Sequence, residues 1–397
     1  MYEYRQQPWK TLYLTYQTIT TTAIRVPIWV VLSMFRSGRP VETWSFKKTM
    51  MTKLLKHMIT VLEKVGGRAP APKHLAIAGG ANVKGNWVYP AEHLIVGDVK
   101  QWAEDAGVGC IRIPGYWFEK KGDNRKAGEP AKPGEKVVYA LHGGGYGGQS
   151  AHPSDLASNV PRGILEYAKT VSRAFTLEFR LSTGPPNEAA NSFPAALIDA
   201  VAGYNYLVNE VGFLTQNIIV EGDSAGGNLA LALVRYLIEN KDAGIPSFPA
   251  PPHDLILLSP WADLGTSHKI EGTSVYTNVK TDFIDLLHPS RLVPNFLGPF
   301  GLDIANRNRY ISPASTAPTM EKVSFNGFPR TFIVAGGAEV LRDQIRTLRD
   351  RMVVDLGSSQ VEYYEPAGAV HDYLIFLWFE PERTETLEAI ARWLASE

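Results

Sequence analysis

The chain has 397 residues, of which 45% are apolar and 20% charged, a composition typical of a globular protein with a sizeable core. Forty Lys and Arg balance forty Asp and Glu, so no net charge favours nucleic acid or an acidic substrate. The single cysteine, Cys110, excludes an intrachain disulfide and fits a reducing, cytoplasmic location, where we expect it to be buried. The chain also lacks the common zinc signatures, and we expect no metal.

Residues 12–35 are rich in apolar side chains and threonine, but Arg25 and Pro27 interrupt them. The segment is too polar for a membrane span, so we expect a helix packed on the protein. Apolar residues at helical spacing among lysines predict an amphipathic basic helix over 43–65. Together these helices predict an N-terminal cap segment, residues 1–70, placed over a core of residues 71–397.

An alternative for the N-terminus is peripheral contact with a membrane. Residues 28–32 read Ile-Trp-Val-Val-Leu and lie close to Arg36 and Arg39, the mixture that interfacial helices carry. The sequence leaves membrane association and a homodimer open.

Gly, Pro and Ala predict a connector over 66–85, and Pro130 and Pro133 predict an exposed loop over 122–134. A buried strand is predicted between that loop and a run of glycines, over 136–142. Three shorter strands are predicted to open the sheet, over 87–90, 93–96 and 110–114.

The glycine run follows the strand as His142-Gly143-Gly144-Gly145-Tyr146-Gly147-Gly148. Its G-x-G-x-x-G spacing admits a dinucleotide-binding turn, with Glu166 as the ribose acceptor. Against this, the residues after Gly148 do not open a helix, and three predicted strands already precede the run. The competing interpretation is that the amides of Gly143 and Gly144 point at a developing oxyanion.

Further strands are predicted over 173–181, 254–258, 330–335 and 361–364, and a helix over 193–209. The polar loop 182–192 follows a strand, so it is expected to edge the site. Residues 264–328 lack strand periodicity and predict an excursion that caps the site. Strands alternating with helices predict an α/β fold, with a mostly parallel sheet and helices on both faces.

Residues 217–231 combine a short apolar strand, the motif Gly222-Asp223-Ser224-Ala225-Gly226 and an apolar run of helical length. This pattern predicts a nucleophile elbow with Ser224 at the turn and glycine on both sides for steric reasons. The alternative is a glycine-rich turn with an idle serine.

A serine nucleophile needs a base and a carboxylate that orients the base. His371 follows the last predicted strand, and Glu339 follows the strand before it. The order Ser224, Glu339, His371 is the order of α/β-hydrolases. Asp343 remains an alternative acid, although it is expected to lie one turn into the next helix.

Several motifs together resemble the hormone-sensitive-lipase-like branch of the α/β-hydrolases, from about residue 137 to the C-terminus. They are His142-Gly143-Gly144-Gly145, Phe179-Arg180-Leu181, Phe193-Pro194-Ala195-Ala196-Leu197, Gly222-Asp223-Ser224-Ala225-Gly226, Ser259-Pro260-Trp261-Ala262-Asp263-Leu264 and the late His371. Two features depart from the family: its usual aspartate in Asp-Pro-Leu-x-Asp is here Glu339, and the loop 182–192 is longer than usual.

The resemblance implies an eight-stranded α/β-hydrolase core with a helical cap and hydrolysis of carboxylic esters, usually with short or medium acyl groups. It implies Ser224 as nucleophile, His371 as base, and the amides of Gly143, Gly144 and Ala225 as the oxyanion hole, with no cofactor. The expected partner is a small, apolar ester. Two other functions stay open: an acyltransferase using the same triad, and a ligand receptor without catalysis.

Overall fold

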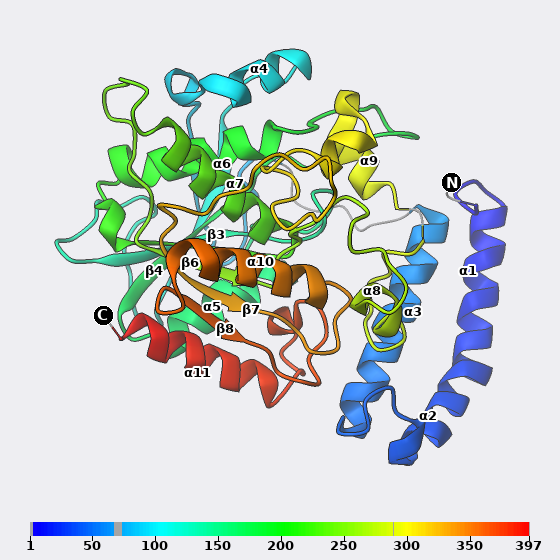
Figure 1. Cartoon of the computed structure of the whole chain (residues 1–397). Coiled ribbons are helices and arrows are strands. Elements are labelled where there is room, and N and C mark those ends of the chain that lie inside the picture. The colour runs from blue at the N-terminus through cyan, green and yellow to red at the C-terminus, as the bar shows by residue number, and fades with distance from the viewer. Residues whose placement is uncertain (1–2, 67–73, 289, 397) are drawn as a thin grey trace.

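A computed structural model of the chain describes residues 3–66, 74–288 and 290–396. These residues contain a mostly parallel sheet of eight strands, as predicted (Figure 1). The strands are β1 (Lys84–Val88), β2 (Ile113–Glu119), β3 (Lys136–Leu141), β4 (Val171–Leu177), β5 (Ile218–Asp223), β6 (Asp254–Leu258), β7 (Arg330–Val334) and β8 (Val361–Tyr364).

The strands lie in the order β1-β2-β4-β3-β5-β6-β7-β8. β2 runs antiparallel to both β1 and β4, and every pairing from β4 to β8 is parallel. All residues of β5 and β6 are buried, because central parallel strands are covered on both faces. Because these strands are parallel, the loops after β3, β5, β7 and β8 lie at one edge of the sheet.

Helices cover both faces of the sheet, as predicted, and each face has its own apolar core. Val137, Tyr139 and Leu141 of β3 belong to one core, and Val138 and Ala140 to the other, as the alternation of a strand requires. The first core contains residues of α4 (Gly97–Asp105), α6 (Ala195–Asn205), α7 (Ala225–Asn240) and α10 (Arg342–Leu356). The second contains residues of α5 (Asn159–Tyr167) and α11 (Glu382–Leu394).

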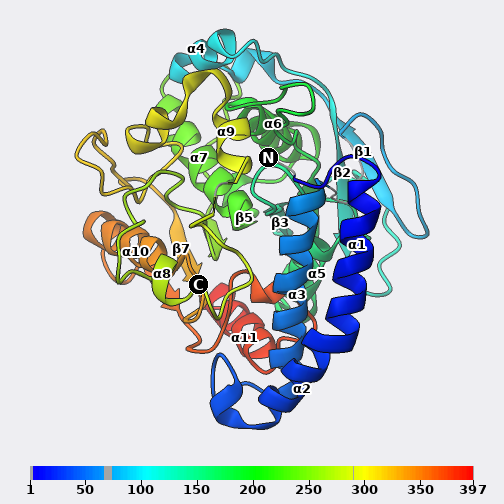
Figure 2. The ribbon, with the colours of Figure 1, turned by 90° about the vertical axis from the view of Figure 1, so that its right-hand side faces the viewer.

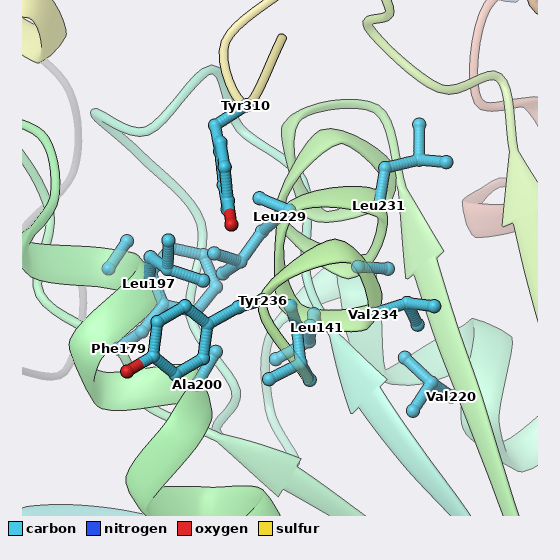
Figure 3. Packing of buried hydrophobic residues seen from close by; sticks show 14 of the residues in the cluster. Leu141, Phe179, Leu197, Ala200, Val220, Leu229, Leu231, Val234, Tyr236 and Tyr310 are labelled. Carbon is cyan, nitrogen blue, oxygen red and sulfur yellow. The ribbon is translucent and has the colours of Figure 1, made fainter. Parts of the chain in front are cut away.

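Figure 3 shows how the first core packs around α7. Leu229, Val234 and Tyr236 project from α7, and Leu141 of β3 and Val220 of β5 come from the sheet. All five side chains are at most 1% exposed. This dense packing fixes α7, and with it the turn at its N-terminus, against the sheet.

The N-terminal helices form a hairpin along one side of the molecule (Figures 1 and 2). α1 (Trp9–Thr20), a π-helical turn (Thr21–Arg25) and α2 (Val26–Met34) follow one another, and α3 (Phe46–Val65) returns beside them. Ser45 begins α3 by accepting a hydrogen bond from the amide of Lys48, and Gly66, with φ of 67°, ends it. No helix in the described part of the chain is long and apolar enough to cross a membrane.

The excursion predicted over 264–328 contains no strand among its described residues. Its described residues hold two short α-helices, α8 (Ser274–Thr277) and α9 (Leu292–Leu297), and two 3₁₀ helices, Gly298–Phe300 and Leu302–Asn306. The proposed division into a cap of residues 1–70 and a core of residues 71–397 stays a prediction, since its boundary falls within residues 67–73, outside the described residues. Most of the predicted connector 66–85 also precedes the first strand.

The strand predicted over 93–96 is wrong. Residues 92–94 form a single 3₁₀ turn, because the hydroxyl of Tyr236 donates to the carbonyl of Leu94 and accepts from the amide of Val96. The backbone groups of this segment are therefore satisfied without a neighbouring strand.

Cys110 is only half-buried, not fully buried as expected, and burial raises the pKa of its thiol to about 11.

Candidate active site

The turn between β5 and α7 has the geometry of a nucleophile elbow. Ser224 adopts φ of 52° and ψ of −114°, a strained conformation for a residue with a side chain. A Cβ atom at Gly222 would lie 2.2 Å from the carbonyl oxygen of Gly226, and one at Gly226 would lie 1.8 Å from that of Leu141. Both glycines are therefore required by close backbone contacts, as the sequence predicts.

The late histidine lies against this serine. His371 Nε2 is 2.9 Å from Ser224 Oγ, within hydrogen-bonding distance, although the two residues are 147 positions apart. Both side chains are buried, at 4% and 6% exposure. A buried imidazole in contact with a buried hydroxyl can accept its proton in a site that holds little water.

Glu339 lies on the other side of the imidazole. Its Oε2 is 3.4 Å from His371 Nδ1, an ion-pair contact that is longer than a good hydrogen bond. The side chain of Glu339 is fully buried. Burial alone would lower the pKa of His371, but the carboxylates of Glu339, Asp282 and Asp223 raise that pKa above its ordinary value.

Asp343, the alternative acid, is held elsewhere. Its Oδ2 accepts a hydrogen bond of 2.7 Å from the amide of Ser274, where α8 begins. Its Oδ1 is 3.2 Å from Arg342 Nε. Asp343 therefore connects α10 to the excursion, and the structure brings Glu339 to the histidine.

Asp282 is a residue that the sequence analysis missed. It is fully buried in the excursion, and its Oδ1 accepts from the amides of Phe283 (2.8 Å) and His371 (3.2 Å). Its Oδ2 accepts from the amide of Val340, at 2.8 Å. Burial raises the pKa of Asp282 to about 6. This carboxyl group joins the loop of Glu339 to the loop of His371 and fixes both.

The predicted oxyanion hole requires one correction. The amide of Gly143 donates to Asp223 Oδ2, at 3.0 Å, so its only N–H group is already engaged by a side chain. Gly144 and Gly145 follow with φ of 92° and 64°, and a Cβ atom at Gly143, just before them, would lie 3.1 Å from that of Ser224. Ala225 is the first residue of α7, where amides have no partner within the helix.

Three further carboxyl groups lie behind the elbow. Glu221, Asp223 and Asp372 are all nearly inaccessible, and burial raises the pKa of each. For Asp223 the pKa rises to about 6. Asp372 Oδ2 lies 3.5 Å from His371 Nε2, but burial first and the charge of Asp223 second raise its pKa well above the ordinary value. Burial therefore favours the neutral form of Asp372 beside the histidine.

Aromatic and aliphatic side chains surround the glycine turn. Tyr146 stacks on Phe296 of α9 at a ring distance of 3.9 Å and donates to Asn228 of α7. A Cβ atom at Gly145 would meet Leu292, also on α9. The loop 182–192 edges this region, as predicted, because the amide of Ser182 donates to the carbonyl of Tyr146 at 2.7 Å. The surroundings of the turn are thus mainly apolar.

Two cavities among the described residues have linings that do not include Ser224. One of about 610 Å³ is lined by residues that include Arg235, Glu239 and Arg309. Another of about 480 Å³ is lined by residues that include Cys110. Within the described residues, no cluster of His, Cys, Asp and Glu side chains is suited to hold a metal ion.

Comparison with known proteins decides the family. The model of a family described as having the α/β-hydrolase fold matches residues 137–375, more than half of the chain. The chain belongs to the α/β-hydrolases. This membership excludes the dinucleotide-binding interpretation of the glycine run, and α5, with Glu166, begins only at Asn159. The prediction of a hydrolase enzyme is confirmed.

Relatives and solved structures agree with this placement. The chain is 27% identical over 268 residues to the esterase LipU of Mycobacterium tuberculosis, which covers 67% of this chain and 79% of the relative. It is 50% identical over 184 residues to a triacylglycerol lipase of the same organism, 46% of this chain and 34% of the relative. A hormone-sensitive lipase from a metagenome library shares the fold, with a TM-score of 0.55, 20% identity and coverage of 93% and 96%. The predicted resemblance to the hormone-sensitive-lipase-like branch is confirmed.

Proposed function

We propose that this α/β-hydrolase cleaves carboxylic esters through an acyl-serine intermediate, with Ser224 as nucleophile, His371 as base and Glu339 as acid. One observation carries the proposal: the 2.9 Å contact between Ser224 Oγ and His371 Nε2 at a strained elbow. Relatives named esterase and triacylglycerol lipase support the choice of an ester as substrate.

In the first half of the reaction, Ser224 Oγ attacks the ester carbonyl while His371 Nε2 takes its proton. The tetrahedral intermediate collapses, the carbon–oxygen bond to the alcohol breaks, and His371 returns the proton to the leaving alcohol. Water then attacks the acyl-serine by the same route and releases the free acid and Ser224. Glu339 stabilises the charged imidazole at each proton transfer, from the side of Nδ1.

The amides of Gly144 and Ala225 are the oxyanion donors in this proposal. Gly144 lies in the glycine turn and Ala225 follows Ser224 at the start of α7, where amides at a helix N-terminus favour negative charge. Gly143 serves instead to hold Asp223, through the hydrogen bond from its amide. A Cβ atom at Gly143 would also lie 3.1 Å from that of Ser224, which explains glycine here.

The proposed substrate is a small apolar ester with a short or medium acyl group. Phe296 and Leu292 of α9 lie against the glycine turn, and Phe283 lies beside His371 at a ring distance of 5.9 Å. An acyltransferase would need a site for a second alcohol, and a ligand receptor would need no base. No contact among the described residues favours either over hydrolysis.

The experiment is a panel of p-nitrophenyl esters of increasing acyl length, assayed with the wild-type chain and Ser224→Ala. Hydrolysis should be fastest for short or medium chains and fall at least about 10³-fold in Ser224→Ala. Ser37→Ala, an exposed serine on the N-terminal hairpin, is the matched control and should keep full activity. Activity that survives Ser224→Ala, or acyl groups that appear only on added alcohols, would refute the proposed hydrolysis.

A further inference from the structure

The outer side of the N-terminal hairpin exposes a line of large apolar side chains. In α1 these are Trp9, Leu12, Tyr16 and Ile19, each between 56% and 62% exposed. Their spacing of three, four and three residues places them on one face of the helix. No side chain of α1 is fully buried, so this face is not part of the apolar core.

The line continues through α2 to Phe35, just past the end of the helix, and Leu32 and Met34 are exposed there as well. The spacing from Ile19 to the next large apolar side chain that is exposed, Ile24, is five residues, and the π-helical turn Thr21–Arg25 lies across this step. In an α-helix, one extra residue would rotate the next side chain by about 100° around the helix axis. A π turn contains one residue more than an α turn, so it absorbs the extra residue and leaves the side chain on the same face. The remaining members are Ile24, Ile28, Val31 and Phe35, between 51% and 64% exposed. We call these eight side chains the outer stripe.

The same hairpin is more basic than the rest of the chain. Residues 1–66 contain ten Lys and Arg against three Asp and Glu, whereas the whole chain has forty of each. Arg36 and Lys47, in and after the turn between α2 and α3, are exposed. Neither has an acidic partner among the described residues. The hairpin therefore combines a long apolar face with positive charge.

We propose that the outer stripe binds an anionic lipid surface, with the helices α1 and α2 lying in the plane of the interface. Apolar side chains along one face with basic residues beside them are the composition of interfacial helices. An exposed apolar face of this extent marks an interaction site. A second copy of the chain is the poorer partner, because it would bring two positively charged hairpins together.

The inner side of the hairpin holds the loops of the candidate active site. Lys56 of α3 donates to the carbonyl of Asp282, at 3.0 Å, and the indole of Trp44 donates to the carbonyl of Gly368, at 2.7 Å. Asp282 and Gly368 belong to the loops that fix and carry His371. The hairpin thus lies between the proposed lipid surface and those loops; in Figure 1, α1 is outermost and α3 lies between it and the rest of the chain. Binding itself does not depend on the proposed hydrolysis.

The test is flotation of the full chain with vesicles of phosphatidylcholine alone or of phosphatidylcholine and phosphatidylserine in equal amounts. The wild-type chain should float with the anionic vesicles and lose binding as salt is raised. The triple variant Leu12→Gln, Ile19→Gln, Ile28→Gln should lower partitioning at least about tenfold. The matched control is Ile270→Gln, Leu302→Gln, Val354→Gln, which removes three apolar side chains at least 60% exposed elsewhere and should float like the wild type.

Two further measurements separate lipid binding from catalysis. Ser224→Ala should float like the wild type, and the triple variant should hydrolyse a water-soluble p-nitrophenyl ester as fast as the wild type. Equal flotation of the triple variant and the wild type would overturn the proposal. So would a wild-type dimer in sedimentation without vesicles that the triple variant converts to monomer, because the outer stripe would then be an interface between copies.

Discussion

The acid of the proposed triad is the residue on which the geometry bears most directly. Glu339 faces His371 Nδ1 from a fully buried position, and Asp343 is bonded to the amide of Ser274. We predict that Glu339→Gln lowers kcat by roughly 10⁴-fold, because the imidazolium loses its stabilising charge. Asp343→Asn should cost far less. Both are measured as kcat on a p-nitrophenyl ester, with circular dichroism as the control for folding.

The reverse order of these two effects would contradict the assignment. If Asp343→Asn were crippled while Glu339→Gln kept most of its activity, the acid would have to move into α10. The structure argues against that outcome, since Asp343 shares its two oxygens between Ser274 and Arg342.

We expect the charge of Asp282 to affect the pH dependence of the reaction. Its negative charge is one of the causes that raise the pKa of His371. The base acts as neutral imidazole, so kcat/KM is lost as pH falls through that pKa, with a midpoint above the ordinary histidine value of about 6.5. In Asp282→Asn one negative charge is gone, the pKa falls, and the midpoint should move to lower pH.

Asp285→Asn is the matched control, because Asp285 bonds to His288 in the same excursion and is not among the charges acting on His371. Its midpoint should stay at the wild-type pH. If Asp282→Asn lowered kcat/KM equally at every pH, Asp282 would act only by holding the two loops together and not through its charge.

Elements with regular periodicity could be predicted closely from the sequence. The strands β6 and β8 have the predicted bounds, and β5 with its glycine-flanked serine has the predicted turn. These segments are governed by local patterns: a buried strand is an apolar run, and an elbow needs glycine where the backbone has no room. For the same reason the residues after strand ends, Glu339 and His371, could be placed at one edge of the sheet.

Long-range contacts of single polar groups could not be predicted. Asp282 accepts from amides 58 and 89 residues away, in a segment without periodicity. The amide of Gly143 is engaged by a carboxylate 80 residues away, which removes it from the predicted oxyanion hole. The false strand at 93–96 has the same origin, since the hydroxyl that satisfies its backbone comes from Tyr236. Each pairing depends on the finished fold.

At the scale of the whole molecule, the sheet presents Ser224, Glu339 and His371 at one edge, and the segments outside the sheet close around them. The excursion supplies Asp282 and the apolar side chains of α9, and the N-terminal hairpin binds the loops from outside through Trp44 and Lys56. The proposed catalytic edge and the proposed lipid-binding face therefore lie on opposite sides of the N-terminal hairpin.

The most direct test of the central claim is covalent labelling by a fluorophosphonate, in which Ser224 Oγ displaces fluoride. The account predicts one phosphonyl group per wild-type chain in the intact mass, located by peptide mapping to the peptide that contains Ser224. His371→Gln should be labelled far more slowly and Ser224→Ala not at all. A folded wild-type chain that stays unlabelled, or a label on another residue, would contradict the proposal that Ser224 is the nucleophile.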